Sequence, residues 1–238
     1  MILFRSLLFA AAFYSWSVVC AILLVPVLAL PRRWLLLGMR LWSRSVNTLL
    51  RVICDIRVDI RGLENVPAGD ALIASKHQTM FDVFVQFGVL KGSLFVLKKE
   101  LMIIPIFGWI ALRIGSIVVD RDGQAAALRD MVRRAQEPFR LGDRQLVIFP
   151  EGTRKTPGAP PDYKPGVAGL YRELGVPVHP VATNAGLHWP ARGFLRRPGG
   201  IVYEFLEPIP PGLKRAEFMR LLEERIETAS NRLLAEGA

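Results

Sequence analysis

The chain places a histidine and an aspartate five positions apart in an otherwise apolar stretch, "ASKHQTMFDVF" (74–84). On one continuous helix, His77 and Asp82 would lie about 140° apart around the axis and would not meet. They can meet if His77 lies in a strand-to-helix loop and Asp82 in the first turn of the helix, with Thr79 as its N-cap. The carboxylate would then fix the imidazole tautomer and leave the other ring nitrogen to accept a proton. The pair is either such a general base or a buried histidine satisfied by a carboxylate.

A second polar stretch, "FPEGTR" (149–154), ends the continuous apolar run "QLVIF", which is typical of a strand covered on both faces. Loops at the carboxyl ends of strands hold the ligands of open α/β sheets. Arg154 supplies a guanidinium suited to phosphate, and Glu151 a carboxylate suited to substrate hydroxyls. Gly152 permits close backbone approach, and Thr153 adds a hydroxyl. The alternative is an ordinary turn with solvated side chains.

Two further stretches combine apolar strands with polar residues. In "GSIVVDR" (115–121), Arg121 is a second candidate for binding phosphate, unless it only pairs with the preceding aspartate. In "VPVHPVA" (176–182), two prolines indicate an edge strand or a bulge beside a site, and we expect His179 to be structural. The three histidines and two cysteines lack ligand spacing, so we expect no metal site and no disulfide framework.

Strands that alternate with helices would position these residues. Hydrophobic periodicity predicts strands at 56–62, 71–75, 94–99, 115–120, 145–149, 176–183 and 200–207. It predicts helices at 81–90, 100–112 (kinked or broken by Pro105), 124–141, 167–174 and from Lys214 onward. This alternation predicts an α/β domain over residues 55–238, with a mixed, largely parallel sheet flanked by helices.

The N-terminal part of the chain, residues 1–54, has a different pattern. Residues 6–31 carry no formal charge, and as a helix they would extend about 39 Å, enough to cross a hydrocarbon core of about 30 Å. A cleaved signal peptide fits less well, because the apolar run is long and Pro31 and two arginines follow it. Residues 34–54 read as an amphipathic interfacial helix. We therefore expect a membrane-embedded helical pair, either a span plus an interfacial helix or a hairpin in one leaflet.

The charge distribution adds an orientation and a set of partners. More arginines follow the apolar run than precede it, which favours a catalytic domain at the cytoplasmic face of the inner (cytoplasmic) membrane. The formal net charge of +10 suits nucleic acid, anionic lipid or an acidic carrier protein. The arginines of residues 32–51 are expected to attract anionic lipid. Nucleic acid is not expected as a partner, because no series of base-stacking aromatic residues lies on a basic strand.

Taken in order, the four stretches resemble the 1-acylglycerol-3-phosphate O-acyltransferase family of membrane phospholipid synthesis. That family carries His-x4-Asp, a Gly-to-Asp-Arg strand, Phe-Pro-Glu-Gly-Thr-Arg and a Val-Pro-x-x-Pro strand, and the match runs over about residues 55–210. The chain departs from the family at Lys76, often asparagine, at Val118, usually aromatic, and at Lys155, frequently serine. His179 also replaces an aliphatic residue.

The resemblance implies a glycerolipid acyltransferase-like fold and a role for each site residue. His77 would be the general base, and Asp82 would orient it. The phosphate and glycerol of the acceptor would be held by Arg121, Glu151, Gly152, Thr153 and Arg154. Lys98 and Lys164 are further candidates for contacts with phosphate or with the acyl donor. The resemblance also implies the helical pair in the membrane that composition predicts independently.

The implied reaction transfers a fatty acyl group from acyl-CoA or acyl-acyl-carrier-protein to the free sn-2 hydroxyl of 1-acylglycerol 3-phosphate, which forms phosphatidic acid. We expect no cofactor, and no covalent acyl-enzyme, because the thioester is already activated and no nucleophilic serine or cysteine adjoins the histidine. An imidazole is a side chain suited to exchanging a proton near neutral pH. Two alternatives remain: the same transfer to glycerol 3-phosphate or a lyso-aminolipid, and a non-catalytic module that binds anionic lipid.

Overall fold

The computed structural model describes residues 1–119 and 124–237. Over these residues the strands are β1 (Ile56–Arg61), β2 (Ala71–Ser75), β3 (Ser93–Lys98), β4 (Ile117–Val119), β5 (Gln145–Ile148), β6 (Val178–Thr183) and β7 (Gly199–Phe205). The α-helices are α1 (Ile2–Leu24), α2 (Arg32–Cys54), α3 (Phe81–Val89), α4 (Phe107–Arg113), α5 (Gln124–Phe139), α6 (Gly166–Leu174) and α7 (Arg215–Glu236). Short 3₁₀ turns lie at Pro26–Ala29, Leu63–Asn65, Lys99–Ile103 and Ala185–Leu187.

Within the described residues, the strands form one sheet in the order β1-β7-β6-β2-β5-β3-β4. The β6–β7 pair is antiparallel, and the other neighbouring pairs are parallel. The two central strands β2 and β5 are buried along their whole length, as their continuous apolar sequences predict. The predicted mixed, largely parallel sheet is therefore confirmed.

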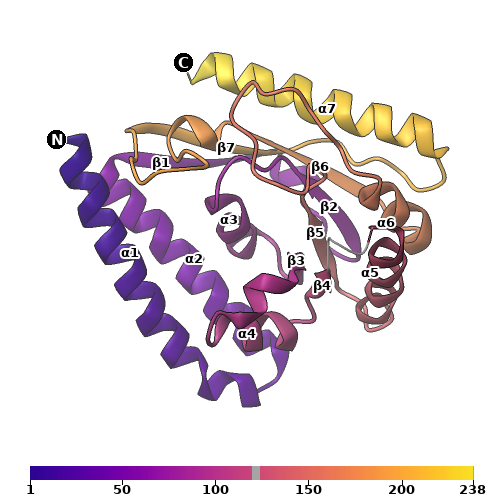
Figure 1. The fold of residues 1–238 in the computed structure, drawn as a ribbon, viewed down its shortest axis with the longest axis horizontal. Coiled ribbons are helices and arrows are strands. Elements are labelled where there is room, and N and C mark those ends of the chain that lie inside the picture. Colours follow the sequence, from indigo (N-terminus) through magenta and orange to yellow (C-terminus); the bar gives the residue numbers. More distant parts are fainter. Residues whose placement is uncertain (120–123, 238) are drawn as a thin grey trace.

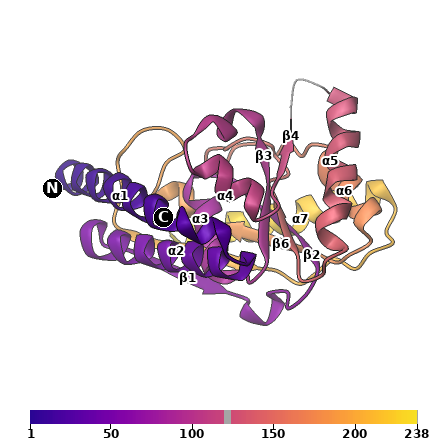
Figure 2. The same cartoon turned by 90° about the horizontal axis from the view of Figure 1, so that it is seen from below.

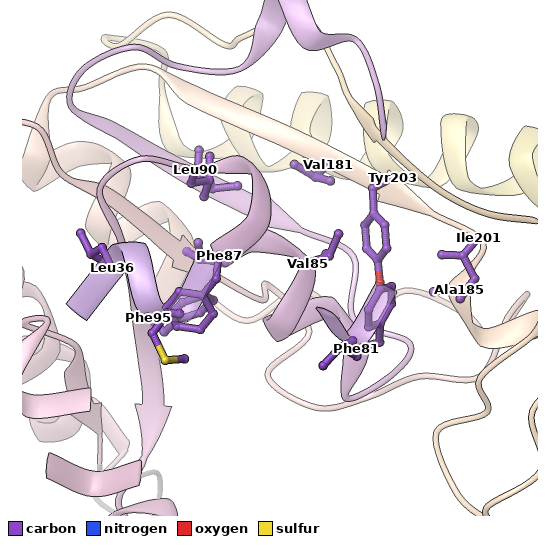
Figure 3. Close-up of a cluster of buried hydrophobic side chains, with 14 of the residues drawn as sticks. Leu36, Phe81, Val85, Phe87, Leu90, Phe95, Val181, Ala185, Ile201 and Tyr203 are labelled. Atoms are coloured by element: carbon purple, nitrogen blue, oxygen red, sulfur yellow. The ribbon is translucent and has the colours of Figure 1, made fainter. Parts of the chain in front are cut away.

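Helices cover both faces of this sheet (Figures 1 and 2). The helices α2, α3 and α4 share one hydrophobic core with one face, and α5, α6 and α7 contribute to the core on the other. Figure 3 shows Phe81 and Val85 of α3 beside Val181, Ile201 and Tyr203 of the sheet, all buried. The helix that carries Asp82 is thus held rigidly against the sheet by its apolar neighbours.

The N-terminal helices α1 and α2 pack against each other, and α2 also packs against α3 and β1. The side of α2 that faces the core carries Leu35, Met39, Val46 and Leu50 at helical spacing, as expected of an amphipathic helix. By contrast, α1 buries few of its side chains, and its apolar residues are largely exposed. Of the described residues, Ile2–Ala29 form a helical segment long and apolar enough to cross a membrane, with 17% of its most apolar window buried. The division of the chain at residue 54 into a membrane part and a catalytic domain stays a prediction.

Two sequence-based expectations about local structure need correction. The helix after His77 begins at Phe81, so its N-cap position is Met80 and not Thr79. The Thr79 hydroxyl still accepts a hydrogen bond from the Phe81 amide at 2.9 Å, a contact of the kind that a capping side chain makes. The strand that contains Pro180 is not an edge strand, because β6 lies between β2 and β7. Pro180 is tolerated there since it falls between the isolated bridge at Val178 and the β6–β7 ladder, which begins at Val181.

Candidate active site

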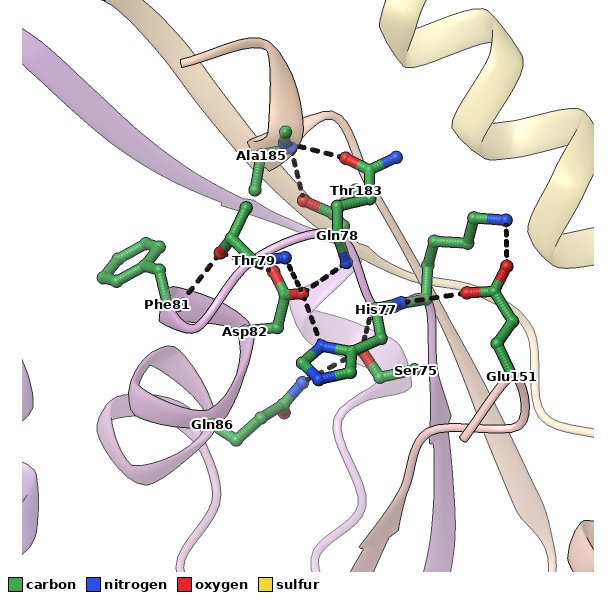
Figure 4. A network of polar contacts seen from close by, with 12 residues as sticks. Ser75, His77, Gln78, Thr79, Phe81, Asp82, Gln86, Glu151, Thr183 and Ala185 are labelled. Carbon is green, nitrogen blue, oxygen red and sulfur yellow. Dashed lines mark hydrogen bonds and ion pairs between the residues drawn. The ribbon is translucent and has the colours of Figure 1, made fainter. Parts of the chain in front are cut away.

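The histidine and aspartate of "KHQTMFD" meet as the strand-to-helix geometry predicts. His77 follows the carboxyl end of β2, and its Nδ1 lies 2.9 Å from Oδ2 of Asp82 in the first turn of α3 (Figure 4). The Asp82 side chain is fully buried, whereas the His77 side chain is 15% exposed. Because Nδ1 is engaged by the carboxylate, Nε2 is the ring nitrogen that can accept a proton from a substrate.

The Asp82 carboxylate is saturated with donors, which fixes its orientation. Its Oδ2 accepts hydrogen bonds from the backbone amides of Gln78 at 2.6 Å and Thr79 at 2.7 Å. Its Oδ1 accepts the Tyr203 hydroxyl at 2.5 Å and the Thr79 hydroxyl at 3.3 Å. Hydrogen bonds from this many donors hold the buried carboxylate in one orientation. The imidazole therefore faces a negatively charged group that cannot rotate away.

Tyr203 is the residue of this arrangement that sequence reasoning missed. It lies on β7, 121 residues from Asp82 in the chain, and its side chain is buried. Burial, reinforced by the charge of Asp82, raises the pKa of Tyr203 well above its ordinary value. The hydroxyl therefore stays protonated and donates to the carboxylate. The sequence held no local signal for this contact, because it depends on how β7 is ordered in the sheet.

The "FPEGTR" loop lies beside His77 because β2 and β5 are neighbours in the sheet and both end at the same edge. The Phe149 ring stacks on the imidazole, with 4.0 Å between ring centroids. The amide of Lys155 donates to the carbonyl of His77 at 2.8 Å. Gly152 has a φ of +67°, which glycine adopts without strain, and this turn lets the loop fold back toward His77. The structure thus brings the first two motifs together.

The residues of the loop differ in exposure and in partners. Glu151 is buried, and its carboxylate accepts hydrogen bonds from the Lys76 ammonium at 2.9 Å and the His77 amide at 3.4 Å. Burial raises the pKa of Glu151, and the charge of Lys76 opposes that rise. Thr153 and Arg154 are exposed, and no ion pair of Arg154 is found among the described residues. Arg154 is therefore the cation of this loop that is available to an anionic substrate.

Lys76 connects the loop to the C-terminal helix. Its ammonium also lies 2.7 Å from the carboxylate of Glu227 on α7, which in turn accepts the Tyr163 hydroxyl at 2.8 Å. Lys76 is 3% exposed, so it is a buried cation between two carboxylates. The sequence marked Lys76 as a departure from the family pattern but held no signal for Glu227, which lies 151 positions away.

The other predicted site residues have varied positions. Arg121 lies outside the described residues. Lys98 is exposed at the end of β3, and Lys164 is exposed and pairs with Asp162 at 2.7 Å. His179 is buried, with Nδ1 2.6 Å from the Asn65 carbonyl, and burial lowers its pKa, which confirms a structural role. Among the described residues, no cluster of three or more histidine, cysteine or acidic side chains could hold a metal ion.

Comparison with known proteins identifies relatives of this chain. The sequence profile of the Acyltransferase family matches residues 57–184. The chain is 36% identical over 200 residues to the 1-acyl-sn-glycerol-3-phosphate acyltransferase of Pseudomonas aeruginosa, which covers 84% of this chain and 76% of that protein. It is 29% identical to human 1-acyl-sn-glycerol-3-phosphate acyltransferase alpha, over 74% of this chain and 62% of the human one.

A solved structure shares the fold. The crystal structure of the 1-acyl-sn-glycerophosphate acyltransferase from Thermotoga maritima superposes with a TM-score of 0.82 over 98% of both chains, at 23% sequence identity. That likeness covers the N-terminal helices as well as the sheet.

Proposed function

The chain belongs to the acyltransferase family, and on that premise we propose that it transfers a fatty acyl group to the free sn-2 hydroxyl of 1-acylglycerol 3-phosphate, forming phosphatidic acid. The observation that carries the chemistry is the 2.9 Å contact between the His77 imidazole and a saturated, buried carboxylate. A histidine paired with a carboxylate in this way can act as a general base and remove a proton from an alcohol.

In the proposed mechanism, Nε2 of His77 takes the hydroxyl proton as the oxygen attacks the thioester carbonyl. The negative charge of Asp82 stabilises the imidazolium that forms. When the tetrahedral intermediate collapses, the C–S bond breaks, and the imidazolium returns its proton to the leaving thiolate. The ester and the free thiol are then the products, and His77 is neutral again for the next cycle.

The acceptor phosphate is proposed to bind at the "FPEGTR" loop. Arg154 is exposed beside His77 and supplies the guanidinium, and Thr153 and Gly152 contribute a hydroxyl and a close backbone approach. Arg121 is proposed as a second phosphate ligand on the resemblance of its motif. Lys98 and Lys164 are proposed for more distant contacts with phosphate or the acyl donor.

For Glu151 the contacts favour a positioning role over direct contact with the substrate. Its carboxylate is already engaged by Lys76 and by the His77 amide, and its side chain is 1% exposed. It therefore holds the loop with Arg154 against the loop with His77. A substrate hydroxyl would have to displace one of these buried partners to reach it.

The N-terminal helices are proposed to bring this site to its lipid substrate. Most of α1 is apolar and exposed, so a bilayer would cover it. The acceptor and the product both reside in the membrane, and a site beside α1 avoids extracting a long chain into water. We propose an inner (cytoplasmic) membrane location, with the catalytic domain in the cytoplasm, where acyl-CoA or acyl-acyl-carrier-protein would serve as the donor.

The test is an assay of the purified protein with labelled acyl-CoA and acyl-acyl-carrier-protein against a panel of acceptors. The panel contains 1-acylglycerol 3-phosphate, glycerol 3-phosphate and a lyso-aminolipid. We expect the highest kcat/KM with 1-acylglycerol 3-phosphate, with the label at the sn-2 position. A preference for either of the other acceptors would replace this substrate assignment, and no transfer to any acceptor would favour a non-catalytic lipid-binding module.

A further inference from the structure

A cavity with basic side chains in its lining lies at the ends of the strands opposite to those that carry His77 and Glu151. It has a volume of about 910 Å³, and its lining includes Arg32, Arg33, Arg40, Lys91, Asp143 and Arg144, which together we call the basic groove. The groove borders the residues where β3 and β5 begin, whereas His77 and Glu151 follow the ends of β2 and β5. A strand as long as β5 spans roughly 13 Å, so the groove is separate from the acyl-transfer site.

The groove has an unbalanced charge. Five of its side chains are basic and one is acidic. None of these six side chains takes part in an ion pair among the described residues, although other arginines of the chain, such as Arg61 and Arg232, do. Burial is the main cause that lowers the pKa of Arg32 to about 10, and the nearby positive charge of Arg144 adds to this shift. A bound anion would relieve the repulsion between these cations.

The walls of the groove are fixed by the fold. Nε of Arg32 donates to the Ile114 carbonyl at 2.8 Å, and Nη2 donates to the Gly92 carbonyl at 3.0 Å. Nη2 of Arg40 donates to the Leu90 carbonyl at 3.1 Å, while its buried Nε has no partner. Position 92 has no room for a side chain, because an added Cβ would clash with the Asp143 carbonyl oxygen. The loops at the starts of β3 and β5 are therefore in close contact.

The rim of the groove is apolar and continues toward the membrane helix. Trp34 and Leu37 of α2 line the groove and are 48% and 41% exposed. Leu30 lies between α1 and Arg32 in the chain and is 46% exposed, and several apolar side chains at the neighbouring end of α1 are exposed as well. Tryptophan beside arginine is typical of the level of lipid headgroups. A soluble anion would contact only the basic side chains of the groove. A lipid would contact these side chains with its phosphate and the apolar rim with its acyl chains.

From these observations we propose that the basic groove binds the phosphate of an anionic glycerophospholipid, with its acyl chains along Trp34 and Leu37. This lipid is not the acyl acceptor, because the groove is at the other end of the strands. The site would hold the N-terminal end of α2 at the headgroup level and favour one orientation of the catalytic domain on anionic membranes. The inference does not depend on the acyl-transfer assignment.

The test uses the full chain and the double variant Lys91→Gln/Arg144→Gln. Both side chains are charged groove residues outside the proposed catalytic machinery. The matched control is Arg172→Gln/Lys214→Gln, which removes the same two charges from exposed positions on the α6 and α7 side. Binding is measured by flotation with phosphatidylcholine vesicles that contain or lack phosphatidylglycerol. Acyl transfer in detergent micelles reports on the integrity of each variant.

We expect wild type and the control to prefer phosphatidylglycerol vesicles equally. The groove variant should lose roughly twenty-five-fold of that preference, about fivefold for each of the two cations removed from an anionic surface, with unchanged transfer in micelles. An unchanged preference, or an equal loss in the control, would overturn the site. The effect of inorganic phosphate on Tm is measured as well. If phosphate raised the Tm of wild type but not of the groove variant, and the groove variant kept its preference for phosphatidylglycerol vesicles, the groove would bind free phosphate and not a lipid. Loss of binding only to an acidic acyl carrier protein would likewise reject the lipid.

Discussion

Tyr203→Phe is the change that tests most sharply how the carboxylate is held. The substitution removes one oxygen and leaves the buried ring, which packs against Phe81 with 5.9 Å between centroids. Oδ1 of Asp82 then loses its 2.5 Å donor and keeps the Thr79 hydroxyl at 3.3 Å. Hydrogen bonds to charged groups contribute about 1.5–3 kcal/mol, so we expect the free energy of unfolding to fall by about 2 kcal/mol.

The effect on catalysis follows from the same contact. If about half of that energy, about 1 kcal/mol, is lost at the transition state, where the imidazolium needs a fixed carboxylate, kcat/KM should fall about fivefold. The assay measures initial rates with saturating donor and varied acceptor, beside thermal unfolding of each variant. The distinctive expectation is lower activity in a protein that still folds at the assay temperature.

Tyr171→Phe is the matched control. Its hydroxyl is hydrogen-bonded as well, since it donates to the Pro210 carbonyl at 2.6 Å and accepts the Leu213 amide at 2.9 Å, but it lies on α6 away from His77. We expect a comparable loss of stability with kcat/KM within about twofold of wild type. Full activity in Tyr203→Phe, or an equal loss in the control, would refute the reasoning.

Two further predictions concern charged residues of the site. Arg154→Gln should raise KM for 1-acylglycerol 3-phosphate about ten- to hundredfold with little change in KM for the donor, since one charge-assisted contact is lost; an unchanged acceptor KM would remove Arg154 from the phosphate site. Lys76→Met should cost about 3–5 kcal/mol of stability at neutral pH, because Glu151 and Glu227 lose their buried counter-ion. Burial already raises the pKa of Glu151, so the folded state holds its proton more tightly and stability falls as pH rises through the window between the unfolded and folded values. The variant should regain part of the loss on acidification, as measured by denaturation at several pH values, and a loss independent of pH would contradict this.

The sequence predicted features whose signals are local. The buried strands β2 and β5, the amphipathic α2 and the break at Pro105 follow from patterns within a few residues, and the structure agrees with each. The His77–Asp82 contact was also predictable, because a strand followed by a helix brings the two side chains together. These parts of the site depend on short stretches of chain.

Features that depend on tertiary packing were not predictable in this way. The two prolines of 176–182 indicated an edge strand or a bulge, yet β6 lies inside the sheet. Pro180 is tolerated there because the ladder with β7 begins one residue later. Tyr203 and Glu227 reach the site from β7 and α7, and their roles depend on strand order and helix docking. The basic groove likewise assembles residues from α2 and from the starts of β3 and β5, which no single stretch of sequence displays.

The central claim is that the His77 imidazole removes the proton from the acceptor hydroxyl. It is tested most directly by the rate of acyl transfer catalysed by purified His77→Ala, with unfolding measured in parallel to establish that the domain is intact. General-base catalysis contributes about 10²–10⁴-fold, so the account predicts a loss of that size or greater in a folded protein. A folded His77→Ala protein with transfer close to the wild-type rate would contradict it.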